Sequence, residues 1–251
     1  MSAGQPHAAT PIVALDVPDA ASALSLAHAL GDSCRFYKVG SELFTAAGPD
    51  IVRALRGDVG ADVFLDLKFH DIPNTVAGAV RSVASLGVRL LTVHASGGRE
   101  MLLAARTTAD EASGGTCGVL GVTVLTSLDA RGLGGAWGRT VESVRDEVLR
   151  LADEAVAAGL HGIVCSGEEA ADVAERHGER LAVLVPGIRL AGSAAHDQRR
   201  VVTPAAAQAA GARYLILGRT VTAAADPRAA MRLVRAELGL GAVVPDGPAD
   251  G

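Results

Sequence analysis

The chain has 251 residues, of which 49% are hydrophobic and 3% aromatic, and 23 Lys+Arg against 28 Asp+Glu give a formal net charge of -5. This length suits one domain with one large core. The lack of a basic excess and the scarcity of aromatic rings argue against a nucleic-acid partner.

Cysteine usage and hydropathy indicate the compartment. Cys34, Cys117 and Cys165 are far apart and form no CxxC pair, so they predict neither a disulfide framework nor a zinc site. No run of 18 apolar residues is present, and Met1 to Thr10 lacks the order of a signal peptide. We therefore expect a cytoplasmic protein with no membrane partner and no bound metal.

Short aliphatic runs recur along the chain and predict eight strands. They are Ile12 to Leu15, Phe36 to Val39, Val63 to Leu67, Leu90 to Val93, Gly118 to Leu125, Gly162 to Cys165, Ala182 to Val185 and Tyr214 to Leu217. Near-continuous apolar runs of this kind are typical of parallel strands that are covered on both faces.

Ala-rich segments with helical spacing separate these runs. They are Ala20 to Leu30, Pro49 to Arg56, Asn74 to Leu86, Arg99 to Glu111, Val141 to Ala158, Glu168 to His177, Pro204 to Ala210 and Pro227 to Leu238. No GxGxxG follows the first strand, which disfavours a dinucleotide-binding sheet. The alternation predicts an α/β fold, a single (β/α)8 TIM barrel over residues 11–240, with flexible segments at 1–10 and 241–251.

One predicted strand closes with charges instead of turn residues, in the order Asp66-Leu67-Lys68-Phe69-His70-Asp71-Ile72-Pro73-Asn74-Thr75. Strand side chains alternate between faces, so Asp66 and Lys68 point the same way and Asp71 follows near the strand end. Charges that lose water are costly unless they pair. A lysine between two carboxylates should keep its proton, as a proton donor to carbon must.

Further polar residues stand at other predicted strand ends, where TIM barrels carry their function. Lys38 lies inside an apolar strand, where a lysine without a partner is rare. Asp16 and Asp71 could instead cap helices, and Thr126 could only satisfy a loop backbone. His94 is read as a structural histidine and receives no role.

The last third predicts a phosphate site. Pro186-Gly187-Ile188-Arg189 follows the seventh strand, a polar loop that includes Gln198 comes next, and Gly218-Arg219 follows the eighth strand. Loops after strands seven and eight form the usual phosphate site of this barrel, and arginine offers a fork for the anion. The alternative is a solvated loop with ordinary surface arginines.

Taken together, these blocks resemble the orotidine 5′-phosphate decarboxylase family. The resemblance covers most of the chain and rests on residues 14–16, 64–75, 122–127, 186–189, 197–200 and 218–219. It implies conversion of orotidine 5′-monophosphate to uridine 5′-monophosphate, the last step of pyrimidine synthesis, without a cofactor.

The resemblance also implies roles for single residues. Asp16 and Lys38 would hold the ribose, and Lys38 and Asp66 would form a charged array with Lys68, the proton donor, and Asp71. Family members are homodimers, so Asp71 and Thr75 would reach across the interface. The remaining contacts would be Thr126 to the pyrimidine and, around the phosphate, Pro186, Arg189, Gln198, Gly218 and Arg219.

Two other functions stay open at this point. A magnesium-dependent sugar-phosphate decarboxylase or aldolase on the same barrel shares an Asp-x-Lys-x-x-Asp core, but the sequence after Asp71 and the loop with Gln198 disfavour it. A barrel that only binds a phosphorylated metabolite is the second alternative. Such a protein should lose Lys68 or an aspartate first, and all are present.

Overall fold

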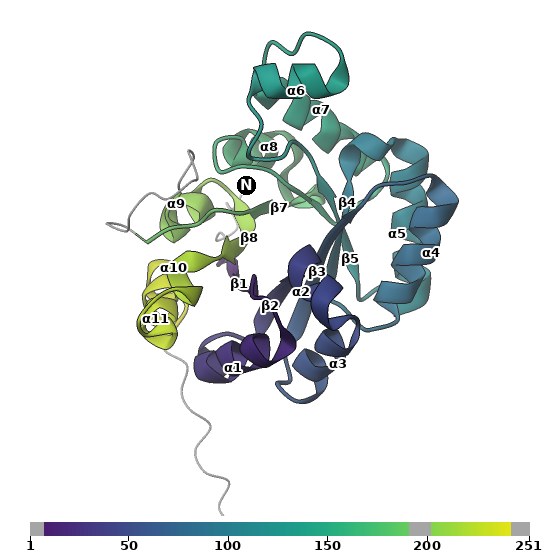
Figure 1. Ribbon diagram of the computed structural model, residues 1–251. Helices are drawn as coiled ribbons and strands as arrows, with labels where there is room; N and C mark the ends of the chain where they lie inside the picture. The colour runs from purple at the N-terminus through teal and green to yellow at the C-terminus, as the bar shows by residue number, and fades with distance from the viewer. Residues whose placement is uncertain (1–7, 191–201, 242–251) are drawn as a thin grey trace, which may run out of the picture.

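Eight parallel strands close into a barrel in this computed structural model, which describes residues 8–190 and 202–241. Each strand pairs with the next in the chain, and β8 pairs with β1 (Figure 1). The strands are β1 (Thr10–Ala14), β2 (Phe36–Gly40), β3 (Asp62–Phe69), β4 (Leu90–His94), β5 (Gly118–Val122), β6 (Gly162–Val164), β7 (Ala182–Val185) and β8 (Ala212–Leu217). The predicted barrel is confirmed.

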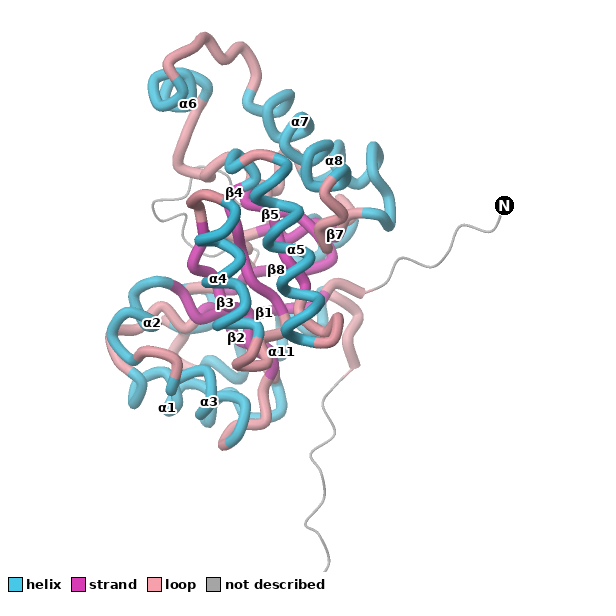
Figure 2. The backbone as a smooth tube through the Cα atoms, turned by 90° about the vertical axis from the view of Figure 1, so that its right-hand side faces the viewer, coloured by secondary structure: helices cyan, strands magenta, loops and turns pink. Residues whose placement is uncertain are grey.

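Helices surround the barrel on the outside (Figures 1 and 2). They are α1 (Ala20–Leu30), α2 (Ser41–Ala47), α3 (Asp50–Gly57), α4 (Pro73–Ala84), α5 (Arg99–Ser113), α6 (Ala130–Trp137), α7 (Val144–Ala157), α8 (Ala170–His177), α9 (Pro204–Ala209), α10 (Arg219–Thr222) and α11 (Pro227–Glu237). Figure 2 shows α6 standing out at one end of the molecule, while α4 and α5 lie side by side along the barrel.

The structure differs from the predicted elements at several places. Helices α2, α6 and α10 were not predicted: α2 and α10 have only seven and four residues, and α6 contains three glycines, which disfavour a helix. The strand predicted to reach Leu125 ends at Val122. Leu125 is 40% exposed, and its carbonyl accepts a hydrogen bond from the Leu128 amide at 2.9 Å, so this apolar tail is part of a turn.

Alternate residues of each strand form two hydrophobic cores. The inner core fills the barrel and contains Ile12, Phe36, Phe64, Leu90, Leu120, Leu184, Tyr214 and Ile216. Residues between them in sequence, such as Val13, Tyr37 and Leu215, point outward and pack under the helices. With a period of two, the next inward positions after Phe36, Phe64 and Leu90 are Lys38, Asp66 and Thr92. The strands therefore place these polar groups above the inner core.

Within the described ranges, every helix is too short or too polar to cross a lipid bilayer.

Candidate active site

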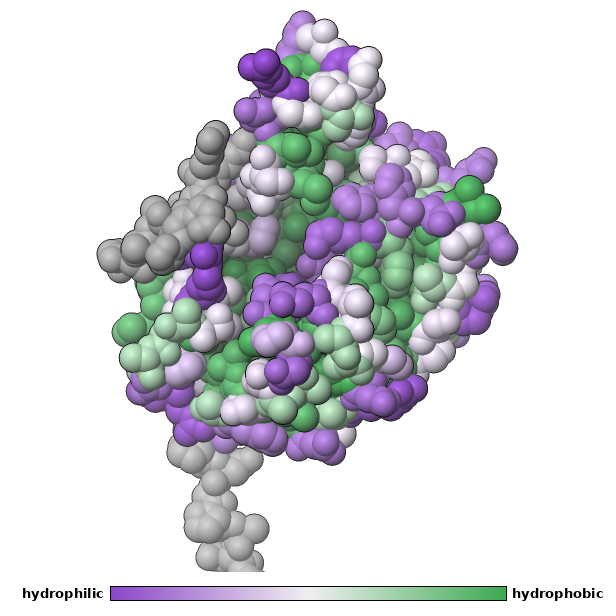
Figure 3. Space-filling model, in the orientation of Figure 1, coloured by the Kyte–Doolittle hydropathy of each residue, from purple (hydrophilic) through white to green (hydrophobic). Residues whose placement is uncertain are grey.

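A pocket of about 370 Å³ opens at the carboxyl ends of the strands. In the space-filling view, a hollow lies near the middle of this face (Figure 3). The pocket is lined by charged residues on one side, by Arg189 and Arg219 on another, and by an apolar floor of Phe64, Val122, Val164, Leu184 and Ile216. Its volume is in the usual range for a small-molecule site.

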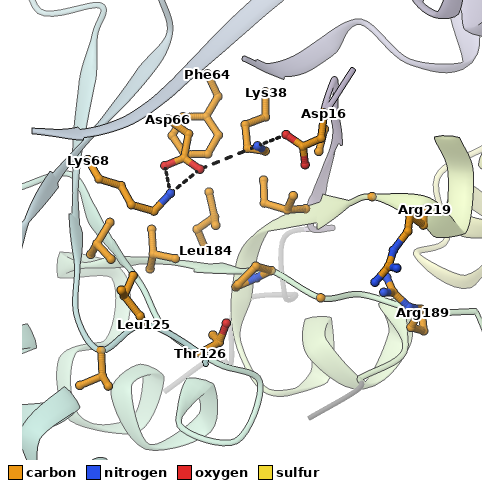
Figure 4. A pocket seen from close by; sticks show the side chains of 18 residues that line it. Asp16, Lys38, Phe64, Asp66, Lys68, Leu125, Thr126, Leu184, Arg189 and Arg219 are labelled. Atoms are coloured by element: carbon orange, nitrogen blue, oxygen red, sulfur yellow. Dashed lines mark hydrogen bonds and ion pairs between the residues drawn. The ribbon is translucent and has the colours of Figure 1, made fainter. Parts of the chain in front are cut away.

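Four charged side chains form a row in this pocket: Asp16 follows β1, Lys38 lies on β2, and Asp66 and Lys68 lie on β3 (Figure 4). The Lys38 ammonium donates to Asp16 at 2.8 Å and lies 3.9 Å from the Asp66 carboxylate. The Lys68 ammonium donates to both oxygens of Asp66 at 2.9 Å. Signs alternate along the row, so each buried charge has an opposite neighbour that offsets its loss of water.

Exposure falls toward the middle of the row and fixes where a ligand can reach it. The side chains of Lys38 and Asp66 are only 10% and 14% exposed, whereas Lys68 is 36% and Asp16 59% exposed. Gly40 lies beside the Lys38–Asp16 pair, and a Cβ atom there would stand 2.9 Å from the Lys38 ammonium. The missing side chain therefore leaves room for this ion pair.

Lys38 and Lys68 are the only lysines among the 251 residues, while every other basic side chain except histidine is arginine. Arginine does not give up its proton in proteins, whereas a lysine ammonium is a compact charge that can. Both lysines of the chain line this one pocket, where either could transfer a proton to a bound ligand.

Lys68 departs from ordinary strand geometry. Its φ angle is +53°, and it is the single non-glycine residue with positive φ in the described part of the chain. Holding a residue there costs about 1–3 kcal/mol. Pairing between β3 and β4 slips at the same place, because Leu65 pairs with Leu91 and Phe69 with Val93. Lys68 and Asp66 therefore meet at a bulge, and not through plain strand alternation alone.

Thr92 on β4 faces this bulge, and sequence reasoning missed it. Its side chain is fully buried, accepts a hydrogen bond from the Lys68 amide at 2.9 Å and donates one to Asp66 at 3.0 Å. A threonine within the apolar run Leu90-Leu91-Thr92-Val93 was a usable signal, since buried hydroxyls need partners.

The two predicted phosphate arginines converge on another side of the pocket (Figure 4). Arg189 is buried and donates to the Ile188 carbonyl at 3.1 Å, while Arg219 is exposed at the start of α10. Pro186 and Gly218 line the same region. Two guanidinium groups at adjacent strand ends suit an anion. Gln198, the remaining predicted phosphate contact, lies outside the described residues.

Thr126 lines the pocket from the turn after β5, beside Leu125 (Figure 4). It is exposed, so its hydroxyl is available to a ligand. The neighbouring apolar floor was not predicted as part of the site, because nothing in an aliphatic strand residue marks it as pocket lining rather than core.

Asp71 and Thr75 do not line the pocket of their own chain, and both are exposed. Asp71 accepts from the Ile72 amide at 2.6 Å, but the residue at the N-cap of α4 is Ile72, so Asp71 does not cap the helix. Asp16 is likewise no cap, because Asp19 caps α1. Ile72 itself is 66% exposed, which leaves an apolar side chain next to Asp71 on the surface.

His94 lies at the end of β4 near the charged row, with its ring 5.2 Å from that of His70. Burial lowers the pKa of His94, and the nearby charges of His70 and Lys68 lower it further. Among residues 8–190 and 202–241, His, Cys, Asp and Glu side chains form no group of three suited to a metal ion.

Comparisons with known proteins agree on the family. A family model described as orotidine 5′-phosphate decarboxylase / HUMPS family matches residues 10–234. The chain is 52% identical over 233 residues to the orotidine 5′-phosphate decarboxylase of Halorhodospira halophila, which covers 90% of this chain and 94% of that one. It is 49% identical to the same-named protein of Pseudomonas paraeruginosa, with 91% and 97% covered.

A solved structure agrees as well. Orotidine 5′-phosphate decarboxylase from Lactobacillus acidophilus superposes with a TM-score of 0.81 at 35% identity, over 92% of this chain and 99% of that one. Together with the barrel and the pocket, these matches show that this chain belongs to the orotidine 5′-phosphate decarboxylase / HUMPS family.

Proposed function

We propose that this chain decarboxylates orotidine 5′-monophosphate to uridine 5′-monophosphate and that it does so without a cofactor. One observation carries the proposal: the alternating row of Asp16, Lys38, Asp66 and Lys68 lines one pocket with Arg189 and Arg219. Two relatives near 50% identity carry the name of this enzyme, and the match covers almost their whole length. The phosphate of the nucleotide would lie at the two arginines, and its pyrimidine would lie near Lys68 on the side of the charged row.

The polar residues of the pocket suggest how the nucleotide would bind. Asp16 and Lys38 would hold the ribose hydroxyls, because Asp16 is exposed at the outer end of the row. Thr126 would hydrogen-bond the pyrimidine. Pro186, Gly218, the two arginines and Gln198 would surround the phosphate. The apolar floor between these groups would exclude water and so strengthen the electrostatic contacts.

The reaction breaks the bond between C6 and the carboxylate and leaves an electron pair on C6. This pair lies in the plane of the ring, so the π-system cannot delocalise it. Lys68 would stabilise the growing charge and then transfer one proton to C6, and water would return a proton to the lysine. The products are CO2 and uridine 5′-monophosphate. Asp66 holds the ammonium from the other side.

Asp71 and Thr75 would complete the site from a partner subunit in a homodimer. Both are exposed, absent from the pocket of their own chain and adjacent to the exposed Ile72, as residues of an interface should be. Near the substrate carboxylate, the partner's Asp71 would disfavour the bound acid relative to the product.

Mixing two inactive variants tests this shared site. In the proposed dimer, each site takes Lys68 from one subunit and Asp71 from the other. A mixed dimer of Lys68→Ala and Asp71→Ala therefore has one site with both changes and one site with neither. After unfolding and refolding together in equal amounts, we expect about a quarter of wild-type activity. Activity no higher than that of the separate variants would contradict a shared site.

Turnover of the purified chain tests the function itself. We expect loss of the ultraviolet absorbance of orotidine 5′-monophosphate at an equal rate with and without EDTA. A magnesium-dependent sugar-phosphate enzyme of the same family would lose its activity in EDTA and act on a different substrate. A chain that binds uridine 5′-monophosphate but never turns over its carboxylated precursor would be a binding protein.

A further inference from the structure

We propose that Thr92 is a positioning residue, whose hydroxyl holds the backbone of Lys68 and the carboxylate of Asp66 in the geometry that the reaction needs. This inference rests on the proposed function and adds a residue to it. Thr92 would not touch a bound substrate, because it is fully buried and does not line the pocket.

The slip between β3 and β4 defines the need for such a residue. Between the pairs Leu65–Leu91 and Phe69–Val93, three residues of β3 stand opposite one residue of β4, and that residue is Thr92. Bulged residues lose their partner in the strand ladder and re-aim a side chain. Here the Lys68 amide donates instead to the Thr92 hydroxyl at 2.9 Å.

The same hydroxyl also reaches the charged row. It donates to Asp66 at 3.0 Å, and that carboxylate oxygen accepts from the Lys68 ammonium at 2.9 Å. A hydroxyl has one proton to donate and lone pairs to accept with, and both capacities are used here. Thr92 thus ties the main chain of Lys68 and the partner of its side chain to one atom.

The conformation of Lys68 makes this support necessary. A φ of +53° is unfavourable for a lysine and persists only where the surroundings hold it. Thr92 is fully buried on β4, a strand that is paired on both sides, so it is a rigid support. Without the hydroxyl, we expect the ammonium to leave its position, which matters for proton transfer but little for nucleotide binding.

Activity measurements on three variants test the inference. In Thr92→Val, which keeps the shape and removes the hydroxyl, kcat should fall about 10–100-fold, with KM and the affinity for uridine 5′-monophosphate within about threefold. Thr92→Ser should restore most of kcat. Thr123→Val is the matched control and should behave as wild type, because Thr123 is also buried but its hydroxyl donates to the Val164 carbonyl and not to a member of the row.

A second measurement reads position without activity. The chain has only two lysines. A sample that carries ¹⁵N at the α-nitrogen of lysine therefore gives two backbone amide signals in an NMR spectrum, one for Lys38 and one for Lys68. Thr92→Val should shift the Lys68 signal and speed its hydrogen exchange, while Thr92→Ser and Thr123→Val should not. If Thr92→Val is unstable, Thr92→Ala replaces it in both experiments.

Two results would overturn the role of Thr92: wild-type kcat and an unchanged Lys68 signal in Thr92→Val, or an equal loss of kcat in Thr92→Ser. A wild-type protein that does not decarboxylate the nucleotide contradicts the proposed function alone. The amide signals then still decide whether Thr92 positions Lys68.

Discussion

The two charged sides of the pocket are built on different parts of the barrel. Lys38 and Asp66 lie within strands, are nearly buried and hold each other in place. Arg189 and Arg219 follow β7 and β8, and Arg219 is exposed on a helix of four residues. Lys38 is held by strand pairing on both sides, and Asp66 by pairing with β2 and by the hydrogen bond from Thr92 on β4. Residues after a strand can adjust to a ligand. From this comparison we expect the strand residues to carry out the chemical step and the residues after β7 and β8 to bind the phosphate.

Removing the ammonium at the strand side should have the largest effect. In Lys68→Ala, we expect kcat to fall by about 10⁴-fold, because both charge stabilisation and the proton donor are lost. Binding of uridine 5′-monophosphate should stay measurable, since the arginines are untouched. Steady-state kinetics and calorimetry report the two quantities separately. Substantial remaining turnover would contradict the assignment of the chemical step to the strand side of the pocket.

Removing a loop arginine should affect binding instead. In Arg219→Ala, we expect affinity for uridine 5′-monophosphate to fall by about 10²-fold and that for uridine to stay unchanged, because only the former carries the phosphate. Arg213→Ala is a matched control, since Arg213 is an exposed arginine near the amino end of β8, the strand that Arg219 follows. Equal losses for nucleotide and nucleoside would contradict a phosphate site at Arg219.

Neutralising the outer end of the row should have the smallest effect. Asp16→Asn keeps an acceptor for the ribose but removes the charge that pairs with Lys38, so we expect kcat/KM to fall about tenfold. Asp50→Asn removes the carboxylate of an exposed pair with Arg53 and serves as the control. A loss as large as that of Lys68→Ala would place Asp16 in the chemical step.

The barrel and the charged row could be predicted from the sequence for a simple reason. Apolar strands alternate with helices eight times, and a lysine such as Lys38 inside an apolar strand demands a partner nearby. The apolar run around Thr92 marks a buried hydroxyl that needs partners, but which partners it has depends on a slipped register that only the paired strands reveal. The short helix α2 and the early end of β5 depend on local turns, which carry no period in the sequence.

The position of Asp71 could not be derived within one chain either. Its spacing from Lys68 predicted a place near the strand end, where the structure has it, but its side chain does not line the pocket of the same subunit. Under the proposed homodimer, Asp71 would act from the partner subunit, and such a contact leaves no trace in the packing of a single chain.

Restoring the lysine chemically tests the central claim most directly. Lys68→Cys presents an accessible thiol, whereas the native cysteines are buried, and burial raises the pKa of Cys34 to about 11 and that of Cys117 to about 12. Treatment with 2-bromoethylamine places an ammonium at nearly the original position, and iodoacetamide places a neutral group there. Wild-type protein treated in the same way controls for damage at other residues.

An ammonium held by Asp66 predicts that Lys68→Cys is inactive, that aminoethylation at this site, verified by mass, restores turnover, and that the neutral adduct does not. Full turnover before treatment, or a fully aminoethylated protein that binds uridine 5′-monophosphate and stays inactive, would contradict the role of Lys68 as the proton donor.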